Sequence, residues 1–219
     1  GWWDQNPALG IDDFKFDFKK MSVSGTLFDL EKLLNISRNY ISRLSKEAVY
    51  ENTLNWALEF DHEFASILEK YKDYAMAIFN IEREQKKPRK DYESFSTIKN
   101  QIWYMFDEYF TGNLVYNFDK IKDKKEIATI LKTYISKYYD ENDDKDTWFN
   151  KIKELTDELG CCSNMKEYRN NPDNYKGSVA DISTVIRVAM TTSTMTPDLY
   201  EILRLLGKKR IEDRINKLI

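Results

Sequence analysis

The sequence predicts an all-α fold, and two of its features lead to that prediction. Only 7 glycines and 4 prolines occur among its 219 residues, so long helices joined by few tight turns are expected. Apolar residues recur three and four positions apart in successive stretches, which places them on one face of a helix. With 42% hydrophobic residues the chain can bury a core, and its length allows one or two domains.

The first half of the chain is expected to contain three long helices. One covers residues 28–44, where leucines and isoleucines fall mostly at helical spacing. The second is opened by Ser45, a residue type that caps helix starts, and continues to Phe60. A third is expected over 68–84. The aromatic stretch QIWYMFDEYF, residues 101–110, is interpreted as core rather than as a surface for stacking bases.

The pair Gly112-Asn113 is expected to separate two helical subdomains. Beyond it, helices are predicted over 124–139 and 146–159, on either side of the acidic run DENDDKD, which would repel phosphate. The next segment, 161–181, is polar, looks like an insertion and carries Asn, Pro and Gly turn signals. We expect it to wrap around the surface.

Two helical patterns meet at a Thr-Pro turn near the end of the chain. The first covers 182–191 and leaves Arg187 pointing away from its apolar face, so that this arginine requires a partner. The second shows three preferences of a helix start, with Thr196 as N-cap, Pro197 at the first helical position and an aspartate after it. Gly207 is expected to end this helix as a C-terminal cap.

A family resemblance appears in the closing segment, IRVAMTTSTMTPDLYEILRLLGKKRIEDRI. It resembles the end of bacterial-type glutamyl-tRNA synthetases, which are class I aminoacyl-tRNA synthetases and typically read PLRxALTGxxxTPxLFEILxLLGKERxxxRL there. Two further patches agree with the family: MSVSGTLFDLEKLLNISRNYI is similar to its SGxxFDLEKLxxxNxxYI stretch, and Pro88-Arg89 matches a third. Val185 and Thr192 depart from it, since the family often has Pro and Gly at these positions.

The resemblance implies a carboxy-terminal fragment without the catalytic domain. Residues 1–45 would end a stem-contact segment, and 46–112 and 113–219 would be the two subdomains of a helical anticodon-binding domain. The full enzyme ligates glutamate to tRNA(Glu) with ATP and magnesium in protein biosynthesis. This fragment would bind the RNA, hold no cofactor and be inactive alone, and its parent would be a cytoplasmic monomer. The stretch KMSVS, residues 20–24, is similar to the family's KMSKS loop but lacks the second lysine, so a structural loop is expected there.

The resemblance also indicates which residues would contact RNA. Arg89 and Arg187 would donate to anticodon bases, because a planar guanidinium can hydrogen-bond pyrimidine acceptors and stack on a splayed base. Thr196, Pro197 and Leu199 would shape the pocket. Candidate contacts to the tRNA backbone are Lys86, Lys87, Lys90 and Lys32.

Composition limits the other functions that the chain could have. Its 34 basic and 37 acidic residues give a net charge of -3, so RNA binding must come from local basic patches. The adjacent Cys161 and Cys162 cannot form a usual structural disulfide, which fits a reducing cytosol, and neither they nor the single histidine, His62, predict a metal or catalytic site. The sequence contains no long apolar run that predicts a membrane span. The alternatives are a helical protein-interaction module or the equivalent domain of a related class I synthetase such as the lysyl enzyme.

Overall fold

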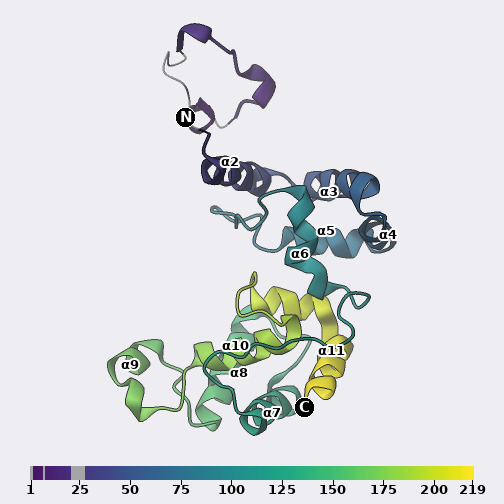
Figure 1. Cartoon of the computed structure of the whole chain (residues 1–219). Helices are drawn as coiled ribbons and strands as arrows, with labels where there is room; N and C mark the ends of the chain where they lie inside the picture. Colours follow the sequence, from purple (N-terminus) through teal and green to yellow (C-terminus); the bar gives the residue numbers. More distant parts are fainter. Residues whose placement is uncertain (1, 7, 21–27) are drawn as a thin grey trace. The chain divides into compact units, whose positions relative to one another are not determined.

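Figure 1 shows a computed structural model of the chain, which describes residues 2–6, 8–20 and 28–219. The predicted all-α class is confirmed, because the described residues contain helices and no strand beyond one isolated bridge between Cys162 and Ser178. Contacts divide the chain into two units, Gly1–Leu33 and Leu34–Ile219. The predicted division at 45 and 112 differs from this one and stays a prediction.

Among its described residues, the first unit contains short helical turns before α2. These are α1 (Trp2–Gln5), η1 (Ile11–Asp13) and η2 (Phe18–Lys20), with Trp2 against Phe14 at a ring distance of 5.2 Å. Most of the KMSVS stretch, residues 21–24, lies outside the described residues. Helix α2 (Leu30–Arg43) begins in this unit and ends in the next.

The first half of the second unit is built from α3, α4 and α5, which pack against one another, and the short α6. Their bounds are Lys46–Phe60, His62–Lys70, Lys72–Asn80 and Ile98–Ile102. The predicted cap at Ser45 is confirmed, since its side chain accepts a hydrogen bond from the backbone N–H of Ala48 at 3.2 Å. The single helix predicted over 68–84 is wrong. The chain breaks at Tyr71 and leaves the helix after Asn80, because Glu82 takes a left-handed conformation with φ 53°.

Arg83, in the turn that follows α5, joins that turn to the end of α2. Its Nη1 donates to the carbonyl oxygens of Ile41 and Leu44 at 2.9 and 3.0 Å, and its Nε donates to that of Phe79 at 2.7 Å. The side chain gives the Leu44 carbonyl, just after α2, a donor, and adds a second donor to the Ile41 carbonyl, which also accepts from the N–H of Leu44 at 3.2 Å. This member of the basic cluster around Pro88 is therefore structural.

The aromatic stretch 101–110 is core, as predicted. Tyr104, Phe106 and Phe110 are buried, with exposed fractions of 5%, 1% and 8%. The hydroxyl of Tyr74 on α5 donates to the carbonyl of Met105 at 3.0 Å, which anchors the stretch to the helix beside it.

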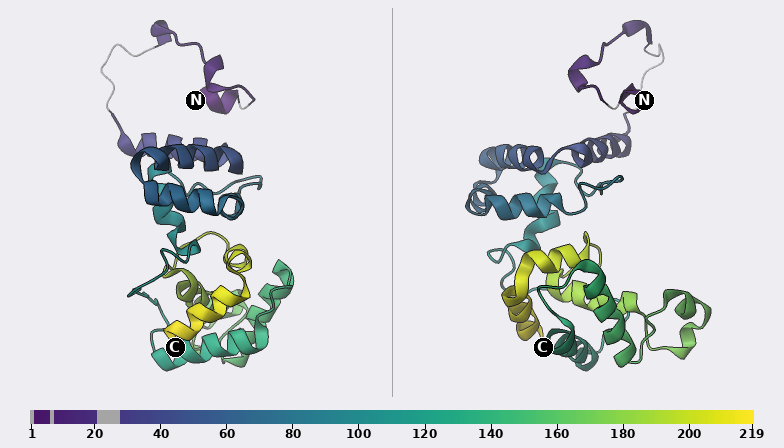
Figure 2. Two further views of the ribbon diagram at one scale, coloured as in Figure 1. Left: turned by 90° about the vertical axis from the view of Figure 1, so that its right-hand side faces the viewer. Right: turned by 180° about the vertical axis from the view of Figure 1, so that it is seen from behind.

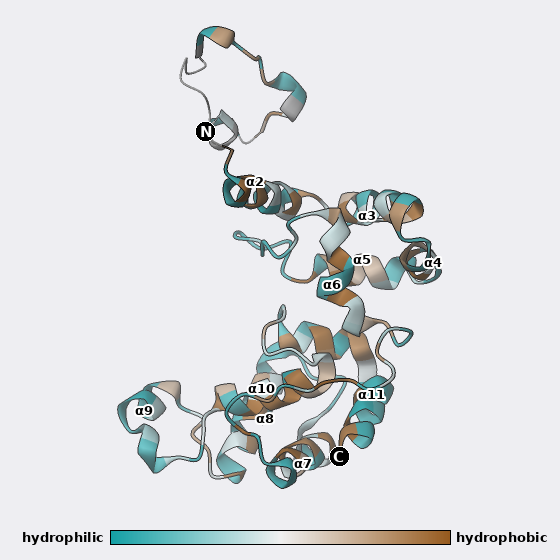
Figure 3. Ribbon diagram, in the orientation of Figure 1, coloured by the Kyte–Doolittle hydropathy of each residue, from teal (hydrophilic) through white to brown (hydrophobic). Residues whose placement is uncertain are grey.

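The second half of this unit surrounds α10, an apolar helix that contacts α7, α8 and α11 (Figures 1 and 3). The bounds are α7 Lys124–Thr133, followed by a π-helical turn Tyr134–Tyr138, then α8 Lys145–Glu158, α10 Val179–Thr191 and α11 Leu199–Leu218. Part of the acidic run has a structural role, because the Asp144 side chain caps α8 by accepting from the N–H of Thr147 at 2.8 Å.

The segment 161–181 does not wrap around the surface, and that expectation is wrong. Its middle, with the hydrophilic α9 (Met165–Asn170), projects from the body of the domain (Figures 1, 2 and 3). Two backbone hydrogen bonds close its base, from Cys162 to Gly177 at 2.9 Å and from Val179 to Cys162 at 3.0 Å. The segment is therefore closed at its base by backbone hydrogen bonds, and Lys120 of the domain lies over the ring of Tyr168 on α9 at 5.7 Å.

Two expectations about the closing helices have different outcomes. The predicted start at Thr196 is wrong, since the N-cap is Asp198, whose side chain accepts from the N–H of Glu201 at 3.1 Å. Gly207 does end the first helical segment of α11, with φ 73° and ψ 164°, although a second segment follows directly. Helix α10 ends at Thr191, and its C-cap residue, Thr192, takes a left-handed conformation with φ 63°.

Replacing Thr192 by glycine tests the strain at this helix end. Thr192→Gly is expected to raise the free energy of unfolding by about 0.5–1 kcal/mol, because the left-handed region costs a residue with a Cβ atom about 1–2 kcal/mol and part of this gain is lost to the freedom of glycine in the unfolded chain. Urea denaturation measures the change. The control Thr184→Gly, inside α10, should lower stability by about 0.3–0.5 kcal/mol, the difference in helix propensity between the two residues. A less stable Thr192→Gly variant would show that the threonine side chain stabilises this turn.

Candidate nucleic-acid interface

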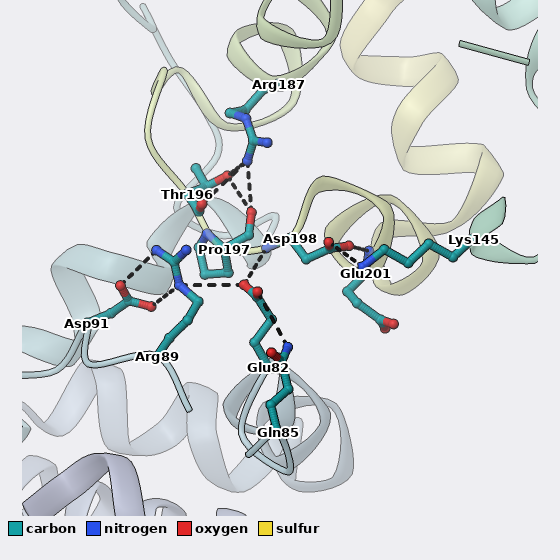
Figure 4. Close-up of polar contacts among 10 residues, drawn as sticks. All are labelled: Glu82, Gln85, Arg89, Asp91, Lys145, Arg187, Thr196, Pro197, Asp198 and Glu201. Atoms are coloured by element: carbon teal, nitrogen blue, oxygen red, sulfur yellow. Dashed lines mark hydrogen bonds and ion pairs between the residues drawn. The ribbon is translucent and has the colours of Figure 1, made fainter. Parts of the chain in front are cut away.

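Arg187 on α10 holds the loop that leads into α11. Its Nη1 donates to the carbonyl of Pro197 at 2.8 Å, to that of Thr196 at 3.4 Å, and to the Thr196 hydroxyl (Figure 4). The partner that the sequence required is thus a loop rather than an acidic side chain. Burial lowers the pKa of the half-buried Arg187 guanidinium, and the nearby Asp198 opposes this shift.

The loop between α10 and α11 presents one exposed apolar side chain, that of Met195, with an exposed fraction of 83%. The Ser193 hydroxyl donates to the Met195 carbonyl at 2.9 Å and accepts from its N–H at 3.1 Å, which makes the tip compact. Thr196 and Pro197 are half-buried behind the tip. Leu199 is 4% exposed, so it supports the loop from the core and presents no surface of its own.

Arg89 forms a two-pronged ion pair with Asp91. Its Nε and Nη2 donate to the two carboxylate oxygens at 2.7 and 2.8 Å, and Nε also lies 3.5 Å from Oε2 of Glu82. The hydrogen bonds to Asp91 raise the pKa of the Arg89 guanidinium. Nη1 makes no hydrogen bond within the described ranges of the chain, so this nitrogen keeps its donors available.

Glu82 joins the corner around Arg89 to the start of α11. The carboxylate oxygen that faces Arg89 also accepts from the N–H of Asp198 at 3.0 Å, and Asp198 in turn pairs with Lys145 on α8 at 2.6 Å. Figure 4 shows Arg89 and Arg187 on different sides of Pro197. Four predicted site residues therefore come together from segments about a hundred positions apart: Arg89, Arg187, Thr196 and Pro197.

Sequence reasoning missed the acidic partners of this site, Glu82 and Asp91. Asp91 follows Arg89 by two positions, a spacing at which side chains do not meet on a helix, although they do meet in the non-helical segment here. The contact of Glu82 with Asp198 joins residues 116 positions apart, and a single sequence carries no local signal for it.

The candidate backbone contacts fall into two groups. Lys86, Lys87 and Lys90 are exposed in the turn beside Arg89, and none of them pairs with a carboxylate among the residues that the structure describes. Lys32 is exposed on α2 in the first unit. An exposed lysine without an acidic partner keeps its full charge for a phosphate.

Other kinds of site find little support in the described residues. No three His, Cys, Asp or Glu side chains in them come together as metal ligands would, and none of their helices is long and apolar enough to cross a bilayer. His62 is exposed in the first turn of α4. Cys161 and Cys162 are free and buried, and burial raises the pKa of the Cys161 thiol.

Comparison with known proteins gives the family. Residues 174–219, which include Arg187 and the loop after it, match a family described as an anticodon binding domain. A glutamate–tRNA ligase of Acetivibrio thermocellus is 42% identical over 218 residues, which are 100% of this chain and 39% of that protein. One of Clostridium perfringens is 38% identical over 221 residues (100% and 40%), and one of Sorangium cellulosum is 30% identical over 218 (100% and 38%).

The chain spans about two fifths of the length of these curated relatives. The similarity covers its entire length, so it includes the corner around Arg89 as well as the closing segment. The chain belongs to the glutamate–tRNA ligase family.

Proposed function

We propose that this chain binds the anticodon loop of tRNA(Glu), with Arg89 and Arg187 as donors to its bases. One observation carries the proposal: the two arginines lie on different sides of Pro197, and each keeps part of its guanidinium unbonded within the described residues. For Arg89 the unbonded nitrogen is Nη1, and for Arg187 the unbonded nitrogens are Nε and Nη2. Donors held on a rigid scaffold suit the acceptors of an unstacked base.

The neighbouring groups fit the same task. The exposed thioether of Met195 offers an apolar surface on which a splayed base can lie. Lys86, Lys87 and Lys90 supply the positive charge that a phosphate backbone requires, which a chain of net charge -3 must concentrate locally. Leu199 acts only by supporting the loop, because it is buried.

The parent protein, in this proposal, is a cytoplasmic and monomeric glutamate–tRNA ligase that uses ATP and magnesium. This chain would hold the RNA without forming glutamyl-adenylate, because its sequence lacks a glycine-rich phosphate turn and a complete KMSKS-type loop. Pyrophosphate exchange dependent on glutamate would contradict that assignment.

Titration of the chain with tRNA at several salt concentrations tests the proposal. We expect the logarithm of the binding constant to fall linearly with the logarithm of salt concentration, with a slope of about −0.7 to −0.9 per phosphate contact. The triple change of Lys86, Lys87 and Lys90 to glutamine should flatten the slope. Absence of binding would favour the alternative of a helical protein-interaction module.

Replacing Arg187 separates direct contact from loop support. Arg187→Ala is expected to weaken tRNA binding by roughly 1–3 kcal/mol and also to lower thermal stability, because it removes the hydrogen bonds that hold Thr196 and Pro197. The matched control Thr196→Val removes the hydroxyl but keeps the guanidinium. Equal losses of affinity in the two variants would mean that Arg187 acts only through the loop.

Replacing Arg89 tests which base it contacts. The anticodons of glutamate and glutamine tRNAs can differ only in the third base, and there cytosine offers the acceptors O2 and N3 whereas guanine presents N–H donors. We expect the chain to prefer cytosine, and Arg89→Gln to reduce the preference by about tenfold, because an amide both donates and accepts. Lys87→Gln, with the same loss of charge, should weaken the binding of the two tRNA transcripts to the same extent. An unchanged preference in Arg89→Gln would mean that Arg89 does not contact this base.

A further inference from the structure

Two carboxylates stand at the corner that is proposed to meet RNA. Asp91 and Glu82 face Arg89, and their side chains are 29% and 22% exposed, against 39% for that of the arginine. Carboxylates repel phosphates, so they would lower the affinity of a corner that contacted only the RNA backbone. Their presence requires an explanation in terms of what Arg89 binds.

The formal charges of the three groups in direct contact at the corner, Arg89, Asp91 and Glu82, sum to less than zero. One guanidinium faces two carboxylates, and the Nε of Arg89 is 2.7 Å from Asp91 and 3.5 Å from Glu82. The Arg89 guanidinium keeps its positive charge, but the two carboxylates offset its attraction for a phosphate, while its N–H groups are still donors. An arginine paired in this way suits the uncharged edge of a base better than the charged backbone.

The same contacts fix the direction of the guanidinium. Asp91 occupies Nε and Nη2 together, and a two-pronged pair sets both the position and the plane of the group. The Glu82 carboxylate also accepts a hydrogen bond from the N–H of Asp198, which holds it in place beside Arg89. The unbonded Nη1 is thereby held in one orientation before any RNA arrives.

We propose that Asp91 is the positioning residue that makes Arg89 a base-reading group instead of a phosphate contact. The inference rests on the proposed function, in which Arg89 meets the third anticodon base. Without the Asp91 carboxylate, the corner loses one negative charge and the guanidinium loses its fixed orientation. It then binds phosphate more strongly and distinguishes bases less well.

The test measures the affinity of the chain for two transcripts that differ only at the third anticodon base, at four or more salt concentrations. For Asp91→Asn we expect the preference for cytosine to fall about tenfold, and the log-log salt slope to become steeper by about 0.8 as one phosphate contact is gained. Asp91→Glu keeps the carboxylate and should keep the wild-type salt slope, while its longer side chain reduces the preference. A simple packing role for Asp91 would alter neither quantity.

Asp107→Asn is the matched control, because the exposed Asp107 pairs with two other arginines, Arg210 at 2.9 Å and the buried Arg214 at 3.5 Å. Asp107→Asn should leave the preference for cytosine unchanged. Its log-log salt slope shows the general effect of removing one negative charge. The inference is overturned if Asp91→Asn keeps the wild-type preference, or if its slope changes no more than that of Asp107→Asn. If Asp91→Asn does not fold by circular dichroism, an unchanged preference in Asp91→Glu overturns it. A wild-type chain that binds neither transcript would refute the proposed function itself, and the role of Asp91 with it.

Discussion

The candidate site depends on how the three residues before α11 are held from two sides. Arg187 donates to the carbonyls of Thr196 and Pro197, and the Glu82 carboxylate accepts from the N–H of Asp198. Each of these hydrogen bonds has one charged partner, a class that contributes about 1.5–3 kcal/mol net at good geometry. The two sides belong to helix α10 and to the turn after α5, so the same contacts that fix the loop also join the two halves of the second unit.

This arrangement separates two tasks that a basic surface often combines. The arginines around Pro197 are engaged by protein groups and keep only part of their donor capacity, which favours orientation over attraction. The lysines of the adjacent turn are exposed and unpaired within the described residues, which favours attraction over orientation. A chain with a net charge of -3 can bind RNA on these terms, because attraction is local and recognition does not rely on net charge.

Local signals predicted local structure well. Ser45 caps its helix and Gly207 interrupts α11, because both roles depend on the backbone of their own neighbourhood. The residues around Thr196 predicted an N-cap there. Its hydroxyl instead accepts a hydrogen bond from Arg187 on α10, and the N-cap is Asp198. Glu82 and Asp91 could not be predicted, since one acts across the fold and the other acts through a non-helical backbone that the sequence does not reveal. Family resemblance is what indicated the two candidate arginines, and it contained no information about which groups hold their side chains.

Four arginines, from the buried Arg214 to the exposed Arg89, fall into two classes by what their guanidinium groups contact. Arg83, Arg187 and Arg214 donate to main-chain carbonyls, which compensate burial only in part, and burial lowers the pKa of each, that of Arg214 to about 10. Arg89 donates to a carboxylate, and its pKa is raised. The first class stabilises helix ends and loops, so a basic composition alone does not identify RNA contacts. Arg187 belongs to this class and still lies beside the loop with unbonded nitrogens, and any contact it makes with RNA must therefore use a side chain that the fold already requires.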